Sequence, residues 1–153
     1  VVASPADLLD ASASTAAIRA AQAGVGLLVH TSSGLPQVRV DRDRFAQVLG
    51  NLLDNAIRHT PPTGQITLSA QAETAGGVRF VVADTGDGIG PEHLPHVFER
   101  FYRVDTARDR THGGSGIGLA IVKALVHAHG GTITAHSDGP GLGARFVIDL
   151  PAA

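Results

Sequence analysis

Two glycine-rich stretches separated by a polar segment are the feature that most constrains how this chain can fold. Residues 84–90 read Asp-Thr-Gly-Asp-Gly-Ile-Gly, and residues 113–119 read Gly-Gly-Ser-Gly-Ile-Gly-Leu. Glycine lets a backbone adopt positive φ and approach a ligand closely. The second stretch runs into a predicted helix, whose free N–H groups can hold phosphate oxygens. Together the two stretches predict turns that close around an anionic ligand.

Size and composition exclude several classes of function. A chain of 153 residues is expected to form one domain, over residues 1–153, with a sizeable core. The net charge of −2 argues against a nucleic-acid binder and against contact with a membrane surface. The absence of cysteine excludes disulfides, thiolate nucleophiles and cysteine–zinc sites. No apolar run approaches the ~18 residues that a membrane span needs.

Hydrophobic periodicity and turn signals predict both helices and strands. Helices are predicted over residues 6–23, 41–59 and 117–129, with a short helix opened by Gly90-Pro91-Glu92. Strands are predicted over residues 25–30, 37–40, 65–71, 78–84, 132–137 and 144–150. Helices and strands are partly segregated, which predicts an α+β fold, a two-layer sandwich with helices on one face of a sheet. The last helix, apolar almost all round, is expected to be buried. Residues 100–114 are highly charged and are expected to form a mobile surface segment.

The second predicted helix carries polar residues on the flank of its apolar stripe. Asp41 or Asp43 can cap its N-terminus. Asn51, Asn55 and Arg58 share one face because they are spaced i, i+4 and i+7. An amide oxygen is a suitable ligand for Mg²⁺, and an arginine one turn later would lie beside phosphates. The alternative is that both asparagines are merely polar residues at a helix margin.

Asp84 ends a predicted strand, directly before the first glycine-rich turn. A buried carboxylate there can accept a hydrogen bond from an exocyclic amine such as that of adenine. It needs such a partner because an unpaired buried charge is costly. A surface turn and a calcium loop are the alternatives. The calcium loop fits poorly, since Gly86 stands at the third ligand position and no glutamate closes the pattern.

The second glycine-rich stretch matches neither of two familiar phosphate-binding loops. It lacks the Gly-Lys-Ser/Thr ending of a P-loop. Gly114, Gly116 and Gly118 are spaced wrongly for a dinucleotide fingerprint, and a polar segment rather than a strand precedes them. What it offers to phosphate is the set of N–H groups at the start of a helix.

Four ordered motifs resemble those of the ATP-binding domain of sensor histidine kinases, a Bergerat-fold branch of the GHKL superfamily. Asn51–Asn55 resembles the N box, Asp84–Gly90 the G1 box, Phe98–Arg103 the F box and Gly114–Leu119 the G2 box. The resemblance covers about residues 41–130. It implies a mixed, mostly antiparallel sheet with helices on one face. It also implies a transferase that moves the γ-phosphate of ATP·Mg²⁺ to a protein histidine.

The resemblance implies a role for each matching residue. Asn55 would hold Mg²⁺ and Asn51 would lie beside the phosphates. Arg58 and Arg103 would contact phosphate oxygens, which completes the expected catalytic set. Asp84 would receive the adenine amine. The full expected ATP-binding set is Asn51, Asn55, Arg58, His59, Asp84, Gly86, Gly88, Ile89, Tyr102, Arg103, Gly114, Ser115, Gly116, Ile117, Gly118 and Leu119.

Within that set, Tyr102 and Ile89 would form walls of the nucleotide pocket, and His59 would either assist binding or cap its helix. An ATP lid is expected within residues 100–114. In the lid, Arg108 and Arg110 are either extra phosphate contacts or part of a solvated charge run.

Two departures from the family pattern matter. Residues 141–144 read Gly-Leu-Gly-Ala where the family has Gly-x-Gly-Thr, so a hydroxyl near the adenine pocket is lost and affinity is expected to be tuned. None of the eight histidines is followed by an acid, as the family's phosphoacceptor histidine is. The chain is therefore expected to be a cytoplasmic catalytic half with little autophosphorylation. Its expected partners are a separate dimerisation and phosphoacceptor domain and a downstream response regulator.

Three rival functions share this fold or its nucleotide site. ATPases of the gyrase, chaperone and mismatch-repair type use a glutamate one turn before the Mg²⁺-binding asparagine to deprotonate water, and Asn51 cannot do so. A serine-kinase anti-sigma factor is disfavoured by the F-box-like segment and the long lid. A non-catalytic nucleotide-binding module is the less economical alternative, because the nucleotide-contacting positions other than Ala144 keep their chemistry.

Two histidine pairs are interpreted as structural rather than functional. His93 and His96 are spaced like a metal pair, but the intervening Pro95 and the lack of a third ligand favour an exposed surface. His127 and His129 end the last predicted helix, where a positive charge suits the helix dipole.

Overall fold

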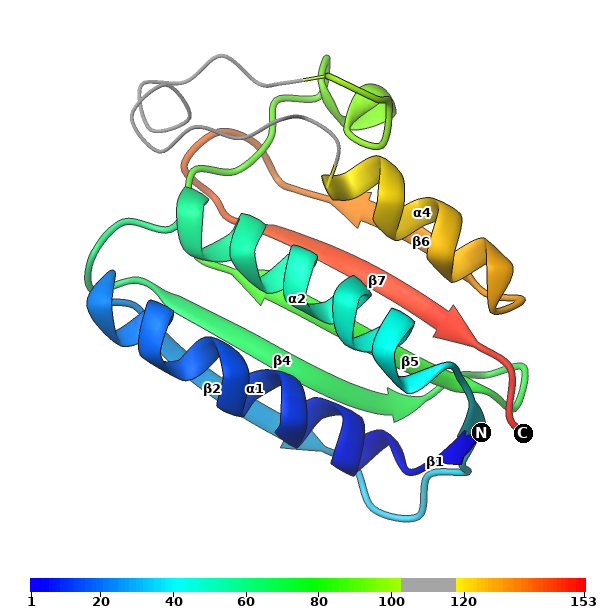
Figure 1. The fold of residues 1–153 in the computed structure, drawn as a ribbon. Coiled ribbons are helices and arrows are strands. Elements are labelled where there is room, and N and C mark those ends of the chain that lie inside the picture. Colours follow the sequence, from blue (N-terminus) through cyan, green and yellow to red (C-terminus); the bar gives the residue numbers. More distant parts are fainter. Residues whose placement is uncertain (103–117) are drawn as a thin grey trace.

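The computed structural model describes residues 1–102 and 118–153, which form a five-stranded sheet and a layer of helices (Figure 1). In sheet order the strands are β2 (Gly26–Thr31), β4 (Gln65–Ala72), β5 (Val78–Asp84), β7 (Ala144–Leu150) and β6 (Thr132–His136). β2 and β4 are parallel, and the other neighbours are antiparallel. Parallel neighbours need a long crossover, and α2 (Arg42–His59) lies in it. The predicted mixed, mostly antiparallel sheet is confirmed.

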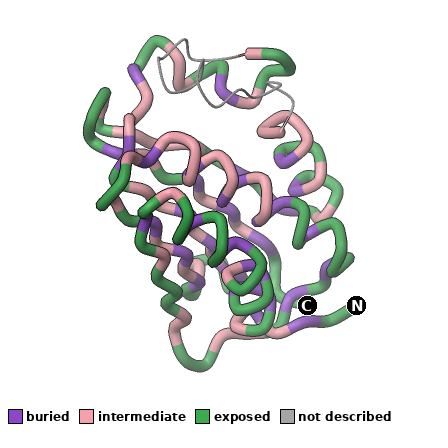
Figure 2. Tube along the Cα trace, turned by 60° about the vertical axis from the view of Figure 1, so that its left-hand side comes forward, coloured by how far each residue is buried: buried purple, intermediate pink, exposed green. Residues whose placement is uncertain are grey.

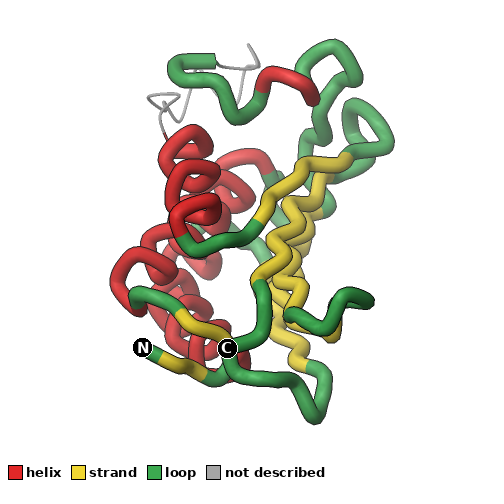
Figure 3. Tube along the Cα trace, turned by 90° about the vertical axis from the view of Figure 1, so that its right-hand side faces the viewer, coloured by secondary structure: helices red, strands yellow, loops and turns green. Residues whose placement is uncertain are grey.

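The helices lie together on one face of this sheet. They are α1 (Pro5–Gln22), α2 and α4 (Gly118–Ala128), and Figure 3 shows them side-on against the strands. Figure 2 shows the fully buried positions gathered between the two layers. The predicted α+β two-layer sandwich is therefore confirmed.

The core is filled from the apolar stripe of α2 and the inward faces of the central strands. Phe45 of α2 meets Phe80 of β5 edge to face, with ring centroids 5.1 Å apart. Every second residue is buried in β4 as far as Ala70 and in β5 as far as Val82, as the alternation of these segments predicts. The largest fully buried side chains are Phe45, Phe80, Leu9, Leu49, Leu52, Leu53, Ile66, Leu68 and Ile148.

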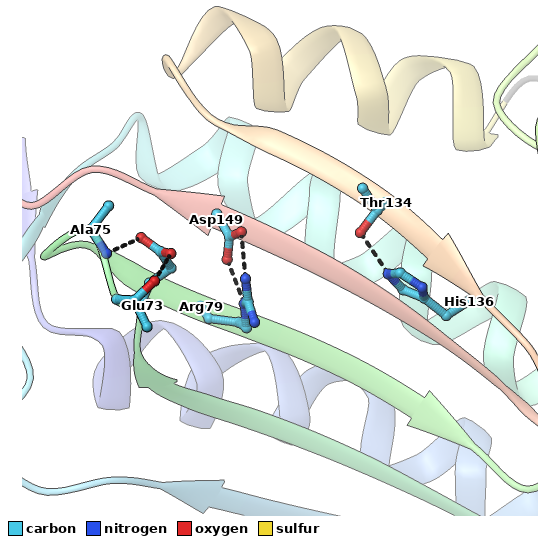
Figure 4. A network of polar contacts seen from close by, with 7 residues as sticks. Glu73, Ala75, Arg79, Thr134, His136 and Asp149 are labelled. Atoms are coloured by element: carbon cyan, nitrogen blue, oxygen red, sulfur yellow. Dashed lines mark hydrogen bonds and ion pairs between the residues drawn. The ribbon is translucent and has the colours of Figure 1, made fainter.

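The opposite face of the sheet carries polar side chains that pair with one another (Figure 4). Arg79 of β5 donates two hydrogen bonds to Asp149 of β7, at 2.8 and 3.0 Å. Thr134 and His136 interact along β6 at 2.9 Å. Glu73 accepts the N–H of Ala75 in the β4–β5 turn. A sheet with one packed and one polar face explains the alternating pattern of its strands.

The two chain ends lie side by side at one end of the molecule (Figures 1 and 3). β1 (Val2–Ala3) pairs antiparallel with β3 (Val38–Arg39), and Ala152 bridges to Val38. Sequence patterning missed β1 because two residues are too few to show a period of two.

Two local expectations were wrong. The short helix opened by Gly90-Pro91-Glu92 is instead a turn over residues 91–93, followed by a 3₁₀ helix, η1 (Leu94–His96). The expected all-round burial of α4 is also absent, since only Val122 and Val126 are fully buried. α4 lies on the outside of the helix layer, so its other side faces solvent with small residues and Lys123. The expected mobile segment falls mainly on residues 103–117, outside the described residues.

Across the described ranges, 1–102 and 118–153, every helix is too short or too polar to cross a bilayer.

Candidate functional site

Most of the described candidate residues gather at the end of the molecule opposite the chain termini. Figure 1 shows that α2 ends, β5 ends and α4 begins at this end. The loop between β6 and β7 lies beside them, because β7 starts at Ala144 opposite Asp84. Asn51 of α2 donates its side-chain N–H to the carbonyl of Gly118, the first residue of α4, at 3.4 Å. Residues from both glycine-rich stretches and from the asparagine helix are thus brought together.

The polar flank of α2 keeps the shared face that its spacing predicts. Asp41 is the N-cap, and its side chain accepts the N–H of Arg44 at 3.1 Å. Asn51, Asn55 and Arg58 are all half-buried, and Arg58 Nη2 donates to Asn55 Oδ1 at 3.4 Å. This places a neutral amide oxygen directly beside a fixed positive charge, a donor set suited to a Mg²⁺-bound phosphate.

Asp84 is a partly buried carboxylate fastened by backbone groups. Its Oδ1 accepts the N–H of Gly86 at 2.9 Å, and the N–H of Ala144 donates to the same carboxylate. Burial raises the pKa of Asp84 above its ordinary value, more than the backbone hydrogen bonds from Gly86 and Ala144 and the nearby His59 lower it. The backbone N–H of Ala144 therefore still contacts Asp84, although alanine lacks the side-chain hydroxyl of the family's threonine.

The turn after Asp84 is attached to the end of α2. The N–H of Asp87 donates to the carbonyl of His59 at 2.8 Å, and His59 Nδ1 lies 3.5 Å from Asp87 Oδ2. A Cβ at Gly86 would lie 2.2 Å from the His59 carbonyl oxygen, so this close approach requires glycine. His59 is thus a partner of the turn, whereas the end of α2 is capped by Thr60.

The same turn interlocks with the glycine loop between β6 and β7. The N–H of Gly141 donates to the Asp87 carbonyl at 2.6 Å, and the N–H of Gly143 to the Gly86 carbonyl at 3.1 Å. A Cβ at Gly88, where φ is +72°, would lie 2.1 Å from the carbonyl oxygen of Gly139. The two loops support each other, so the position of the Asp84 turn depends on a segment some fifty residues away.

Ser137, which sequence reasoning missed, holds this pair of loops together. Its half-buried Oγ accepts the N–H of Ile89 at 2.9 Å and donates to the carbonyl of Gly143 at 2.6 Å. Ile89, an expected pocket wall, is thereby fixed through its backbone. The only sequence signal for such a role is a serine placed just before a Gly-Pro-Gly turn.

Replacing Ser137 with alanine should lower the free energy of unfolding by about 1–3 kcal/mol, because it leaves an N–H and a carbonyl without their shared partner. Urea unfolding of the two proteins measures this change. Ser69→Ala, on the polar face of β4, is the matched control and is expected to change it by less than about 0.5 kcal/mol. Equal stability of the Ser137 variant and the wild type would contradict the role of Ser137 between the loops.

The segment that carries the F-box-like motif packs onto β7, an interior strand of the sheet. Phe98 meets Phe146 of β7 edge to face at 6.0 Å, and Lys123 Nζ lies 5.6 Å from the centre of the Phe98 ring. Tyr102, at the end of the segment, contacts His93 and His96. Nowhere in residues 1–102 and 118–153 do three metal-ligating side chains converge.

His129 has a different role from the one expected at a helix end. Its Nδ1 contacts the Leu125 carbonyl at 2.7 Å, and its Nε2 accepts the N–H of Asp41 at 3.1 Å. A ring that accepts at Nε2 is neutral, so it bonds α4 to the N-terminus of α2 and supplies no charge to the helix dipole. The exposed His127 alone fits the expected placement.

Several candidate residues fall outside the described residues. They are Arg103, Gly114, Ser115, Gly116 and Ile117, together with the lid residues Arg108 and Arg110. Gly118 begins α4 and Leu119 packs against the core.

Comparisons with known proteins agree with this geometry. The profile of the family described as histidine kinase-, DNA gyrase B- and HSP90-like ATPase matches residues 40–153. The sensor protein SrrB of Staphylococcus aureus is 46% identical over 111 residues, which are 72% of this chain and 19% of SrrB. This chain thus spans about a fifth of that relative's length.

Solved structures show the same fold. A mycobacterial sensor histidine kinase, MprB, superposes with a TM-score of 0.87 at 31% identity, covering 99% of this chain and 98% of that one. Full-length ShkA in complex with AMPPNP superposes with a TM-score of 0.86 at 35% identity, covering 100% of this chain and 31% of that one.

Proposed function

Because the chain belongs to the histidine kinase-, DNA gyrase B- and HSP90-like ATPase family, we propose that it is the ATP-binding catalytic domain of a two-component sensor histidine kinase. In this proposal it binds ATP·Mg²⁺ and presents the γ-phosphate to a histidine on a separate domain. The observation that carries the proposal is the pairing of two features at one end of the fold. One is the Asp84 carboxylate, fastened by backbone N–H groups, and the other is the α2 face with Asn51, Asn55 and Arg58.

The described residues fit the parts of a nucleotide. Asp84 would accept the adenine amine, since its own hydrogen bonds to Gly86 and Ala144 leave further acceptor capacity on the carboxylate. Ile89, fixed by Ser137, and Tyr102 would flank the base. The glycines at positions 86 and 88 are needed where they stand for close backbone packing, which keeps the turn in one shape.

The phosphate end would be held by α2. Asn55 would hold Mg²⁺ through its amide oxygen, and Mg²⁺ when bound would neutralise phosphate charge and orient the phosphates. Arg58 lies beside that oxygen and would hold a phosphate oxygen, as Arg103 is proposed to do from outside the described residues. The residues of this chain thus supply positioning and charge neutralisation, the main contributions to catalysis of phosphoryl transfer.

Asn51 favours transfer over hydrolysis. It lies one turn before Asn55 and contacts the Gly118 carbonyl, and an amide cannot take a proton from water. The acceptor imidazole would itself be the nucleophile, so this chain needs no base for it. The kinases and sensor proteins among its relatives support this function over the gyrase-type ATPase, the anti-sigma serine kinase and the non-catalytic module.

The wider context is part of the same proposal. Its partners would be a dimerisation domain that carries the phosphoacceptor histidine and a downstream response regulator. The chain would act in the cytoplasm, as part of a membrane-anchored sensor or of a split kinase, without binding nucleic acid or membrane.

Calorimetric titration of ATP with and without Mg²⁺ tests the nucleotide site. Wild-type chain is expected to bind ATP in the micromolar range. Asn55→Ala should weaken binding at least about tenfold in Mg²⁺, since even residues that only support a metal ligand cost this much. In EDTA the two proteins should bind alike. Gln47→Ala, an exposed amide on the same helix, is the matched control and should bind as the wild type does. No binding by the wild type, or equal Mg²⁺-dependent binding by Asn55→Ala, would contradict the proposal.

A further inference from the structure

Tyr102 is held by two histidines of the preceding turns. His93 Nδ1 lies 2.5 Å from the Tyr102 hydroxyl, and the two ring centroids are 5.8 Å apart. His96 stacks on the Tyr102 ring at 5.2 Å with an interplanar angle of 25°. The backbone fixes this arrangement, because the N–H of His93 donates to Gly90 and the N–H of Tyr102 donates to Glu99. The orientation of the Tyr102 hydroxyl therefore depends on His93.

The neighbour on the other side of His93 favours one of the two ring nitrogens as the proton carrier. Glu92 Oε1 lies 3.5 Å from His93 Nε2. A carboxylate can only accept, so in the neutral ring the proton lies on Nε2 and Nδ1 is left to accept from the Tyr102 hydroxyl. When the ring takes a second proton from solvent, Nδ1 becomes a donor and the hydroxyl must accept.

The hydrogen bond survives this protonation, but its direction reverses. In the neutral state the O–H of Tyr102 is used by His93. In the protonated state the O–H is released and can donate to another acceptor. Among the other charged or titratable groups of the described segment, His96 pairs with Glu99 at 2.6 Å and also stacks on the Tyr102 ring, whereas Arg100 lies over Phe101.

We propose that His93 is a positioning residue for Tyr102, and that its protonation releases the Tyr102 hydroxyl to donate to bound nucleotide. The inference rests on the proposed function, because it takes Tyr102 as a wall of the nucleotide pocket. It extends that function by making nucleotide affinity depend on the protonation state of His93.

The chain offers a clean probe of this switch. Tyr102 is its single tyrosine, so protein labelled with ¹³C-tyrosine gives one Cζ resonance. In the nucleotide-free protein this resonance should shift with pH, with the same midpoint as the His93 ring. The variants are compared in a His96→Gln background, which removes the ring stacked on Tyr102. In that background His93→Gln keeps a hydrogen-bonding side chain but cannot titrate, so its Cζ resonance should stay constant from pH 5 to 8.5. His30→Gln, at an exposed histidine of the edge strand β2, is the matched control and should behave as the wild type does.

Nucleotide affinity completes the test. The ratio of wild-type to His93→Gln affinity for ATP should rise about threefold to tenfold from pH 8 to pH 5.5, the effect of one hydrogen bond gained. Comparing two proteins cancels the titration of ATP itself. Tyr102→Phe, which lacks the hydroxyl, should lose the pH dependence as well, and it serves if His93→Gln folds poorly.

A Cζ resonance that ignores the His93 titration, or that moves equally in His93→Gln, overturns the inference and leaves the proposed function intact. A constant affinity ratio overturns it in the same way. Absence of ATP binding by the wild type overturns both, whereas the Cζ titration in the nucleotide-free protein tests the contact between His93 and Tyr102 without any nucleotide.

Discussion

Gly143→Ala should lower the free energy of unfolding by about 2–5 kcal/mol and remove most of the ATP affinity. The residue has a φ of +74°, a conformation that costs an L-residue about 1–2 kcal/mol. Its new Cβ would also lie 2.2 Å from the Asp84 carbonyl oxygen, so the β5 end and the glycine loop would have to move apart. Overpacking of this kind adds about 1–3 kcal/mol. The displaced end of β5 carries Asp84, so the substitution is expected to weaken ATP binding as well as to lower stability.

Gly141→Ala separates the cost of the positive φ from the cost of the close contact with Asp84. Gly141 lies in the same loop with a φ of +79°, but a Cβ there meets nothing within 4 Å. This variant should lose only the conformational part, about 1–2 kcal/mol. Chemical denaturation and ATP titration of both variants measure the difference. If the two variants lose equal stability, the close contact with Asp84 is not what requires glycine at position 143.

Asp84→Asn should weaken ATP binding by about tenfold to a hundredfold while making the empty protein more stable at neutral pH. The amide oxygen can keep the hydrogen bonds from Gly86 and Ala144, but the amide NH₂ would face the adenine amine donor to donor. Loss of a hydrogen bond to a charged group costs about 1.5–3 kcal/mol, which corresponds to this loss of affinity.

The gain in stability has a definite pH dependence. Burial raises the pKa of Asp84 in the folded chain, so folding disfavours its charged form. The stability that protonated Asp84 supports is fully present below the pKa of the unfolded chain, about 4, and is lost as pH rises through the raised folded pKa. Asparagine does not ionise, so its advantage over the wild type should grow between pH 3 and pH 7.

Thermal unfolding across that range measures the effect of Asp84→Asn. Asp149→Asn is the control, because Asp149 is an acid of the polar sheet face paired with Arg79. It should leave ATP affinity unchanged. An Asp84→Asn variant that binds ATP like the wild type would exclude Asp84 as the adenine partner.

Local patterns sufficed to predict most of the fold. The stripe that contains Phe45 and Leu52 identified α2, and the alternation in β4 and β5 identified both strands and their pairing. The parallel pairing of β2 with β4 could not be inferred from the residues, because it depends on where α2 returns the chain. The burial of α4 was overestimated because composition cannot tell an outer helix from an inner one.

The candidate site was predicted unevenly for a similar reason. Asn51, Asn55 and Arg58 share a face because helical geometry is local. The roles of Ser137 and of the Ala144 N–H depend on contacts between segments about fifty to sixty residues apart, which no spacing rule contains. The partners of Ser137 and of the Ala144 N–H depend on how the two glycine loops pack against each other.

The two ends of α4 differ in the hydrogen bonds that attach them to the rest of the fold. At its C-terminal end His129 contacts both Leu125 and Asp41, so this end is attached to the N-terminus of α2. At the other end, the described hydrogen bond from the neighbouring helix is the long one from Asn51 to Gly118. The helix has 11 residues and is about 16 Å long. A rotation of α4 by about 10° about its C-terminal end would therefore move Gly118 by about 3 Å. A displacement of that size would break the contact between Asn51 and Gly118, so the candidate phosphate-binding face of α2 depends on the orientation of α4.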